Sequence, residues 1–214
     1  IKVVVFNSYV DSSFTNYTAY VNQDGKEFGK INAQFLVDAL GGKGKIILLQ
    51  GVAGNSVCIE RWEGAKEVFD QYPDIEIVGE ANGNWDYADG KAATEALLSA
   101  NPEIDGVWSQ GGAMTQGAID AFVAAGRPLV PMSGEAGNGF LAYWIKYQGV
   151  DKFDSVAPLY DTGIVVDALD ILVRALNGET VEKTNILPMD SITADTVSQY
   201  YREDLPDAYW AGSR

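Results

Sequence analysis

The sequence predicts an α/β fold, a doubly wound parallel sheet with helices on both faces. Two observations lead to this class. Short apolar runs alternate with longer segments of helical period along the 214 residues, an order typical of repeated βα units. Glycine, proline or Asn-Gly ends most of the helical segments. Right-handed crossovers then bring the loops that follow the strands to one edge of the sheet, where ligands of open α/β sheets bind.

The elements are expected in the following order. A first strand covers 1–6, and a polar, aromatic loop runs from Asn7 to Gln23. A helix follows and ends at Gly41-Gly42; its apolar stripe predicts a buried face formed by Phe28, Ile31, Phe35, Leu36 and Leu40. The next strands are expected over 45–50, 75–79, 105–109, 128–132, 155–158 and 185–189.

The helices between these strands are identified by their period and their ends. One helix follows the turn 51–56, carries Trp62, Ala65 and Phe69 on one side and ends at Pro73. Asp86, with Asp89 three residues later, is a typical N-cap for a helix over 87–100. Further helices are expected over 113–125, 140–147 and 161–177. The tail 191–214 is aromatic enough that we expect it to pack on the body of the protein.

Composition excludes several functions. Fifteen basic against thirty acidic residues give a net charge of −15, which disfavours nucleic acid and anionic lipid as partners. The chain has no histidine and one cysteine, Cys58, a small buried residue by type. A Ser/His/Asp relay, a Cys/His pair and a His-based zinc site are therefore excluded. No catalytic residue, metal or cofactor is expected, and Glu135 with Asp161 is the one carboxyl pair considered for glycoside hydrolysis.

The N-terminus and the loops at the sheet edge suggest further expectations. Ile1 begins directly inside an apolar run, so we expect a processed or truncated product of a longer chain. Trp85 ends a Gly/Asn loop before a helix cap, where its ring either stacks on a sugar or packs in the core. Arg61 either reaches a ligand or, as is more usual for a lone arginine, pairs with a nearby carboxylate. Neutral and acidic groups suited to hydroxyls also follow two strands, namely Gln110, Gly111, Ser133 and Glu135.

These segments, in this order, resemble the type I periplasmic binding proteins, in particular the ribose-binding-like branch of the sugar-binding subunits of ABC importers. The resemblance covers roughly residues 1 to 190. It is carried by Val3-Val4-Val5-Phe6-Asn7, Asp24 with Gly29, Gly44-Lys45-Ile46, Gly51 through Ser56, Glu60 through Gly64, Trp85-Asp86, and Gln110-Gly111 with Gly117-Ala118. The resemblance implies two similar lobes, joined by three crossing segments, that close on a sugar like a hinge.

The resemblance also implies boundaries and a role for each. Residues 1–21 correspond to a remnant of the N-terminal lobe, 22–157 to the C-terminal sugar-binding lobe, 158–180 to a helix that returns to the N-terminal lobe, and 181–214 to the final crossover strand and tail. The chain is therefore expected to hold one lobe and an incomplete second lobe. The implied protein is a monomer in the periplasm or at the cell surface, with a small-molecule sugar and an ABC permease as partners.

Site residues follow from the same resemblance. Asn7 lies where the family usually has an aspartate, Trp85 where it has a stacking phenylalanine, Gly111 where it has an asparagine and Ser133 where it has an aspartate. Ile59 replaces an arginine that clamps ribose, which argues against ribose itself. Replacement contacts are expected from Gln110, Glu135, Tyr160 and Asp161.

Two other classes of function remain open from the sequence. The same fold serves as the effector-binding domain of sugar-responsive transcription regulators, although the acidity of this chain argues against DNA binding. An enzyme on an α/β scaffold is the other, and the missing histidine, phosphate loop and dinucleotide fingerprint all argue against it.

Overall fold

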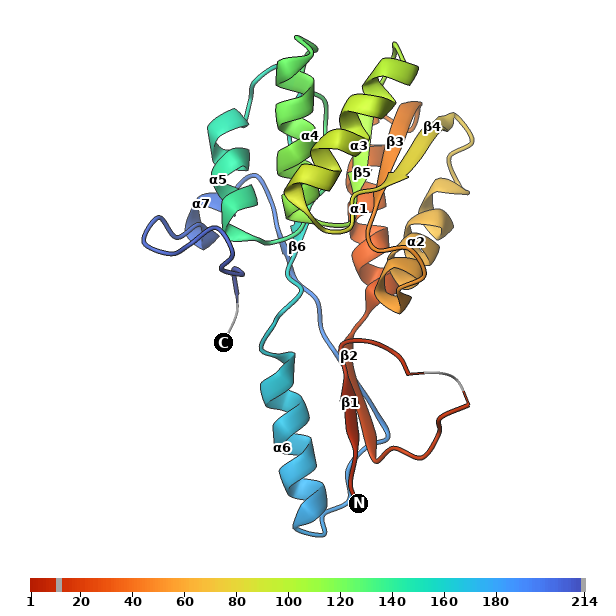
Figure 1. Cartoon of the computed structure of the whole chain (residues 1–214), viewed down its shortest axis with the longest axis vertical. Helices are drawn as coiled ribbons and strands as arrows, with labels where there is room; N and C mark the ends of the chain where they lie inside the picture. The colour runs from red at the N-terminus through yellow and green to blue at the C-terminus, as the bar shows by residue number, and fades with distance from the viewer. Residues whose placement is uncertain (11–12, 213–214) are drawn as a thin grey trace.

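The computed structural model describes residues 1–10 and 13–212, arranged as a large body and a smaller arm (Figure 1). The sheet of the body is parallel and has the order β4-β3-β5. The chain here alternates strand and helix: α1 (Gly25–Leu40), β3 (Gly44–Gln50), α2 (Ser56–Phe69), β4 (Ile75–Asn82), α3 (Tyr87–Ala100), β5 (Gly106–Ser109) and α4 (Gly112–Ala124). The predicted α/β class with helices on both faces is confirmed.

Strand β3 shows how the two faces are covered. Ile46 and Leu48 point into a cluster with α1 and α2, whereas Ile47 and Leu49 point into the cluster with α3 and α4. All four side chains are fully buried. A strand buried on both faces reads as a continuous apolar run, as Ile46 to Leu49 does.

Side-chain caps fix where three of these helices begin. The Asp24 side chain accepts from the backbone N–H groups of Lys26 and Glu27 at the start of α1. Asn55 caps α2 in the same way, and Asp86 accepts from Ala88 and Asp89 at the start of α3. The predicted cap at Asp86 is confirmed. Each cap satisfies donors that a helix N-terminus would otherwise leave unpaired.

The arm contains a second parallel sheet and one helix. Strands β1 (Val4–Phe6), β2 (Ala19–Gln23) and β7 (Thr184–Leu187) lie in the order β1-β2-β7. Helix α6 (Ile164–Leu176) packs on this sheet through a small cluster formed by Ala19, Val21, Ile164, Ala168 and Ile171.

The chain passes between arm and body three times, after β2, before α6 and after β7. Gln23 ties the three passages together. Its side-chain N–H group donates to the carbonyls of Leu159 and Pro188, and its Oε1 accepts from the backbone N–H of Asp161. Two short strands, β6 (Ala157–Pro158) and β8 (Ser191–Ile192), pair antiparallel beside these passages.

The C-terminal tail packs on the body, as predicted. Helix α5 (Asn138–Tyr147) and the short helix α7 (Val197–Tyr200) lie together at one side of the body (Figure 1). The buried side chain of Asn138 donates to the carbonyls of Arg202 and Leu205 and accepts from the Arg202 N–H. Nowhere in 1–10 and 13–212 is a helix both long and apolar enough to span a membrane.

Two predicted elements are wrong, and both errors concern strands. The expected loop from Asn7 to Gln23 contains β2, whose end carries the buried polar residues Asn22 and Gln23; such residues conceal a strand from a hydrophobicity pattern. The expected strand 128–132 makes only an isolated bridge between Val107 and Met132. Pro128 and Pro131 lack the N–H groups that a ladder needs.

Three further elements differ in their bounds or pairing. The expected strand 155–158 is reduced to β6 and joins β8 instead of the parallel sheet of the body. The last strand lies at Thr184–Leu187 in the arm. Helix α6 begins at Ile164, three residues later than expected, because Asp161 holds a turn by accepting from the Gly163 N–H.

Candidate functional site

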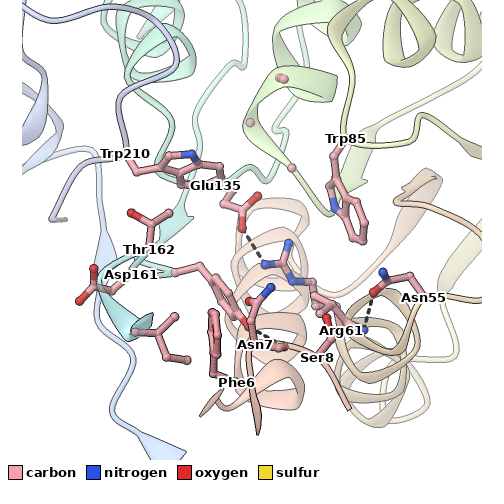
Figure 2. A pocket seen from close by; sticks show the side chains of 16 residues that line it. Phe6, Asn7, Ser8, Asn55, Arg61, Trp85, Glu135, Asp161, Thr162 and Trp210 are labelled. Atoms are coloured by element: carbon pink, nitrogen blue, oxygen red, sulfur yellow. Dashed lines mark hydrogen bonds and ion pairs between the residues drawn. The ribbon is translucent and has the colours of Figure 1, made fainter. Parts of the chain in front are cut away.

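A cavity of about 440 Å³ lies where the arm meets the carboxyl ends of the body strands (Figure 2). This volume falls in the range of small-molecule sites. Its wall combines aromatic and polar side chains from both regions, and the lining residues are Phe6, Asn7, Ser8, Asn55, Val57, Arg61, Trp85, Gly111, Gly112, Ala113, Glu135, Tyr160, Asp161, Thr162, Ile164 and Trp210. The loops predicted to meet at one sheet edge therefore do meet there.

Trp85 is held in the wall by an uncommon backbone. Asn84 and Trp85 both have positive φ, 54° and 57°, a conformation that is strained for a bulky residue. The indole fits because two neighbours are glycines: a Cβ on Gly51 would overlap the ring, and one on Gly111 would lie 2.8 Å from Trp85 Cδ1. Trp85 packs against the apolar core, which is one of the two alternatives expected for its ring. It also lines the cavity, and its stacking on a sugar stays a prediction.

Arg61 and Glu135 form a buried ion pair in the cavity wall. Arg61 Nη2 lies 2.6 Å from Glu135 Oε1, and the exposed fractions of the two side chains are 3% and 6%. Arg61 Nη1 also donates to the Gln110 carbonyl. The guanidinium lies 3.6 Å from the centre of the Phe28 ring. The expectation that Arg61 pairs with a carboxylate is confirmed, but its partner comes from a distant loop.

Burial and the ion pair shift the pKa of the Glu135 carboxyl in opposite directions. Burial raises the pKa of its carboxyl, and the nearby Arg61 charge opposes that rise. Taking a carboxylate out of water disfavours its charged form, and a cation at hydrogen-bond distance restores it. Because the pair is hydrogen-bonded at 2.6 Å, Arg61 supports the ionised form of Glu135.

Tyr160 links the cavity to the arm. Its hydroxyl donates to Asn22 Oδ1 at 2.7 Å and lies 3.4 Å from the Asn7 carbonyl. Burial raises the pKa of Tyr160 to about 12. The Tyr160 hydroxyl therefore stays a neutral donor at physiological pH. Asn7, on the arm side, has a φ of 66°, a conformation that asparagine tolerates better than most residues.

Six of the eight residues predicted for the site line the cavity: Asn7, Trp85, Gly111, Glu135, Tyr160 and Asp161. The structure does not place Gln110 and Ser133 there. Both are fully buried; the Gln110 side chain donates to Gln50 Oε1 and the Cys58 carbonyl, and Ser133 Oγ accepts from the Ser109 N–H. Each follows a strand as predicted, but its side chain fixes neighbouring loops beneath the wall.

Sequence reasoning missed several lining residues, of which Trp210 is the largest. It lies in the tail, far along the chain from the βα loops, and reaches the cavity through an antiparallel bridge to Gly137. Figure 2 shows Trp210 and Trp85 on opposite sides of Glu135. The aromatic composition of the tail predicted packing, but no local signal indicated which ring would face the cavity.

Two nitrogen atoms in the cavity wall are buried donors without a partner among the described residues. The Trp85 Nε1 and Arg61 Nε atoms are buried without a hydrogen-bond partner. Residues 1–10 and 13–212 hold no cluster of three or more histidine, cysteine, aspartate or glutamate side chains that could bind a metal ion. The wall thus offers hydrogen-bonding groups and aromatic faces to a small ligand.

A family model described as periplasmic binding protein domain matches residues 1–180. The chain belongs to this family. The predicted resemblance to the ribose-binding-like branch of type I periplasmic binding proteins holds at the level of the family. Residues 1–180 include the arm strands β1 and β2, helix α6 and the whole βα series of the body.

Relatives in other organisms agree with this family. A xylitol-binding protein of Mycolicibacterium smegmatis is 32% identical over 182 residues, covering 83% of this chain and 50% of its own length. A D-apiose import binding protein of Actinobacillus succinogenes is 32% identical over 132 residues, 62% of this chain and 43% of its own length. The chain thus spans about half the length of these curated relatives. They are named as binding proteins and not as enzymes, in agreement with the non-catalytic role expected from the sequence.

Solved structures give the same result for the fold. An ABC transporter solute binding protein from Thermobispora bispora superposes with a TM-score of 0.85 at 26% identity, covering 99% of this chain and 63% of that one. A solute binding protein from Bacillus halodurans with bound myo-inositol gives a TM-score of 0.82 at 26% identity, over 94% and 68% of the two chains. The arm and body therefore recur together in known members of the family.

Proposed function

We propose that this protein captures a monosaccharide or related polyol in the cavity between arm and body and delivers it to an ABC permease. The cavity itself is the observation that supports this most directly. It has the size of a small-molecule site, and its wall joins tryptophan rings to amide, hydroxyl and carboxylate groups. An aromatic face covers the C–H face of a sugar ring while polar groups bond its hydroxyls.

The proposed ligand contacts come from both sides of the cavity. On the body side, Trp85 supplies an aromatic face and Glu135 a carboxylate, and Gly111 leaves room between them. Asn7, Tyr160 and Asp161 supply amide, hydroxyl and carboxylate groups where the passages enter the arm. The names of the relatives, which include xylitol, apiose and ribose binders, support a ligand of this class.

We propose that the arm is part of the N-terminal lobe and the body is the C-terminal lobe. The expected boundaries at 21/22, 157/158 and 180/181 stay part of this proposal, with one adjustment: β2 runs from Ala19 to Gln23, so the first boundary belongs after Gln23. Closure of two such lobes about three passages is a hinge motion. Gln23, bonded to the other two passages, would lie at that hinge.

Location and partners are part of the same proposal. Transport by an ABC importer implies a protein in the periplasm or at the cell surface, which acts as a monomer and meets a permease after closing on its ligand. The net charge of −15 disfavours a nucleic acid partner. No cofactor is required, because capture and release need only differential binding by two conformations.

A thermal-shift screen against pentoses, hexoses, deoxysugars and polyols tests the proposal. A ligand that binds only the native state raises the unfolding midpoint, by the equivalent of about 2.7 kcal/mol at a concentration of 100 Kd. We expect one sugar or polyol to raise the midpoint in a saturable manner. Trp85→Ala, tested beside it, should reduce the shift by about half or more at the same ligand concentration, because a tenfold loss of affinity lowers this stabilisation to about 1.4 kcal/mol. A protein whose midpoint no member of the panel changes would not be a sugar-capturing protein.

A further inference from the structure

The cavity wall contains two opposite charges that are almost completely withdrawn from water. Arg61 and Glu135 are 3% and 6% exposed, and their closest atoms are 2.6 Å apart. A buried charge is tolerated when it is paired and hydrogen-bonded. The pair therefore contributes no net charge to the cavity, although it contributes two strong hydrogen-bonding groups.

The two residues of the pair differ in how many of their polar atoms are hydrogen-bonded. Two nitrogens of Arg61 are paired: Nη1 donates to the Gln110 carbonyl and Nη2 to Glu135 Oε1, while Nε is buried without a partner. The guanidinium carbon lies 3.6 and 4.9 Å from the centres of the Phe28 and Tyr160 rings. Glu135 keeps one oxygen open, because Oε2 has no hydrogen-bond partner in the part of the chain that the structure describes. The cavity wall thus presents an unpartnered acceptor beside a guanidinium whose charge is already paired with the same carboxylate.

Gly111 keeps that acceptor accessible. A Cβ on Gly111 would lie 3.6 Å from Glu135 Oε2 and 2.8 Å from Trp85 Cδ1. Both side chains border the same space, and Figure 2 shows the Glu135 carboxylate between Trp85 and Trp210. A hydroxyl donor placed beside an aromatic face would fill this space.

We propose that Glu135 is the specificity-determining acceptor of the site and that, with Arg61 neutralised by it, the cavity takes uncharged polyhydroxy ligands and rejects acidic or phosphorylated ones. The inference rests on the proposed capture of a sugar or polyol, and it adds a charge rule: the charge of the ligand decides whether it binds. An anionic group beside Oε2 would meet a carboxylate, and the nearest guanidinium is already paired. Asp161, also in the wall, adds to the repulsion.

Matched pairs of ligands test this rule by isothermal titration calorimetry. The pairs are D-ribose with D-ribose 5-phosphate, D-galactose with D-galacturonate, xylitol with D-xylonate, and myo-inositol with myo-inositol 1-phosphate. For every neutral member that binds, we expect the anionic member to bind at least about tenfold more weakly, the loss of one hydrogen bond to a charged group. Equal affinities within a pair would overturn the inference and leave the proposed function intact.

Glu135→Gln separates the charge of this residue from its shape. The amide oxygen still accepts from Arg61, but the arginine charge is no longer compensated. We expect the neutral member to bind about tenfold to a hundredfold more weakly, as when a bond to a charged acceptor is lost. The anionic member should bind as well as or better than it does to the wild type. An unchanged ratio of the two affinities in a folded variant would contradict the proposal.

Controls distinguish the possible failures. Glu60→Gln changes a carboxylate on the same helix as Arg61 that does not line the cavity, and it should leave both affinities unchanged. Circular dichroism and the unfolding midpoint check that Glu135→Gln is folded; if it is not, the wild-type pairs alone decide. Binding of anionic members only would overturn the charge rule. Binding of none of the eight compounds would overturn the proposed function, and the inference with it.

Discussion

Body and arm are built from the same kinds of element but are buried to different degrees. In the body, α1 and α2 cover one face of the sheet and α3 and α4 the other, and the four central residues of β3 are fully buried. In the arm, α6 buries only Ile164, Ala168, Ile171 and Ala175. Its outward apolar residues include Val166, Leu169 and Leu176, which are 58%, 59% and 65% exposed.

The comparison teaches that apolar residues are buried only where a neighbouring element covers them. The sequence shows which residues are apolar, but the neighbouring helices and strands decide which of them are buried. A helix that is hydrophobic on more than one side is normally covered on more than one side. Buried polar side chains such as Gln23 and Arg61 lie where body and arm meet.

The largest expected effect concerns the core of the body. Leu48→Ala removes a fully buried side chain between α1 and α2 and should lower the free energy of unfolding by about 2–5 kcal/mol. Urea denaturation followed by circular dichroism measures it. A loss below about 1 kcal/mol would show that the body is packed no better than the outer face of the arm.

A smaller effect is expected where the two regions join. Gln23→Ala removes three hydrogen bonds to two other passages, leaving buried groups unpaired at a cost of about 1–3 kcal/mol. Hydrogen exchange of the Asp161 amide, which donates to Gln23, should accelerate. Gln34→Ala is the control, since Gln34 bonds to Asp38 on the exposed side of α1; equal exchange in the two variants would mean that Gln23 does not couple arm and body.

Trp85→Ala tests the body side of the cavity. Loss of the indole should weaken sugar binding at least about tenfold, or about 1.4 kcal/mol, because the ring lies between Gly51 and Gly111 in the cavity wall. The variant should remain folded. Trp62→Ala provides the matched control: this ring contacts Trp108 outside the cavity, so it should lower stability and leave affinity unchanged. Unchanged affinity in Trp85→Ala would remove this residue from the proposed site.

Affinity for a neutral sugar should fall as the pH is lowered. Burial raises the pKa of Glu135 and Arg61 opposes the rise, so this carboxylate is protonated at a higher pH than an exposed one. Protonation replaces a charged acceptor by a weaker neutral carboxyl, and we expect a threefold to tenfold loss of affinity, on the order of one neutral hydrogen bond. The raised pKa also means that its contribution to stability decreases as the pH rises through that pKa.

Titration of the Glu135→Gln variant over the same pH range isolates this group. Its affinity should vary less with pH than that of the wild type. Asp161→Asn serves as the control for the other cavity carboxylate, and Tyr160 does not ionise in this range because burial raises its pKa to about 12. A pH dependence that persists in Glu135→Gln and vanishes in Asp161→Asn would assign the effect to Asp161.

The smallest effect is expected on the outer face of the arm. Leu169 is 59% exposed, so Leu169→Ala should change the free energy of unfolding by no more than about 0.5 kcal/mol. The measurement is the same urea titration that is used for Leu48→Ala. A loss as large as that of Leu48→Ala would show that this face is covered in solution, and would require a partner for it.

Local sequence signals were sufficient for most of the body. Ile46 to Leu49, the cap at Asp86 and the helix end at Gly41-Gly42 each follow from residue type and spacing, because propensity and capping act over a few residues. The same signals placed the loops that carry Trp85, Gly111 and Glu135 at one edge of the sheet. They failed at β2 and at 128–132, where buried polar residues and prolines made the pattern misleading.

The sequence by itself therefore determined the α/β class, the family and the loops after the body strands that reach the cavity. Only the tertiary structure decided which side chains pair with each other and which of them face the cavity. It paired Arg61 with Glu135, directed Gln110 and Ser133 beneath the wall, and brought Trp210 from the tail to the cavity. Partners of this kind lie far apart along the chain, and their pairing depends on how sheets and helices pack, which no local pattern encodes.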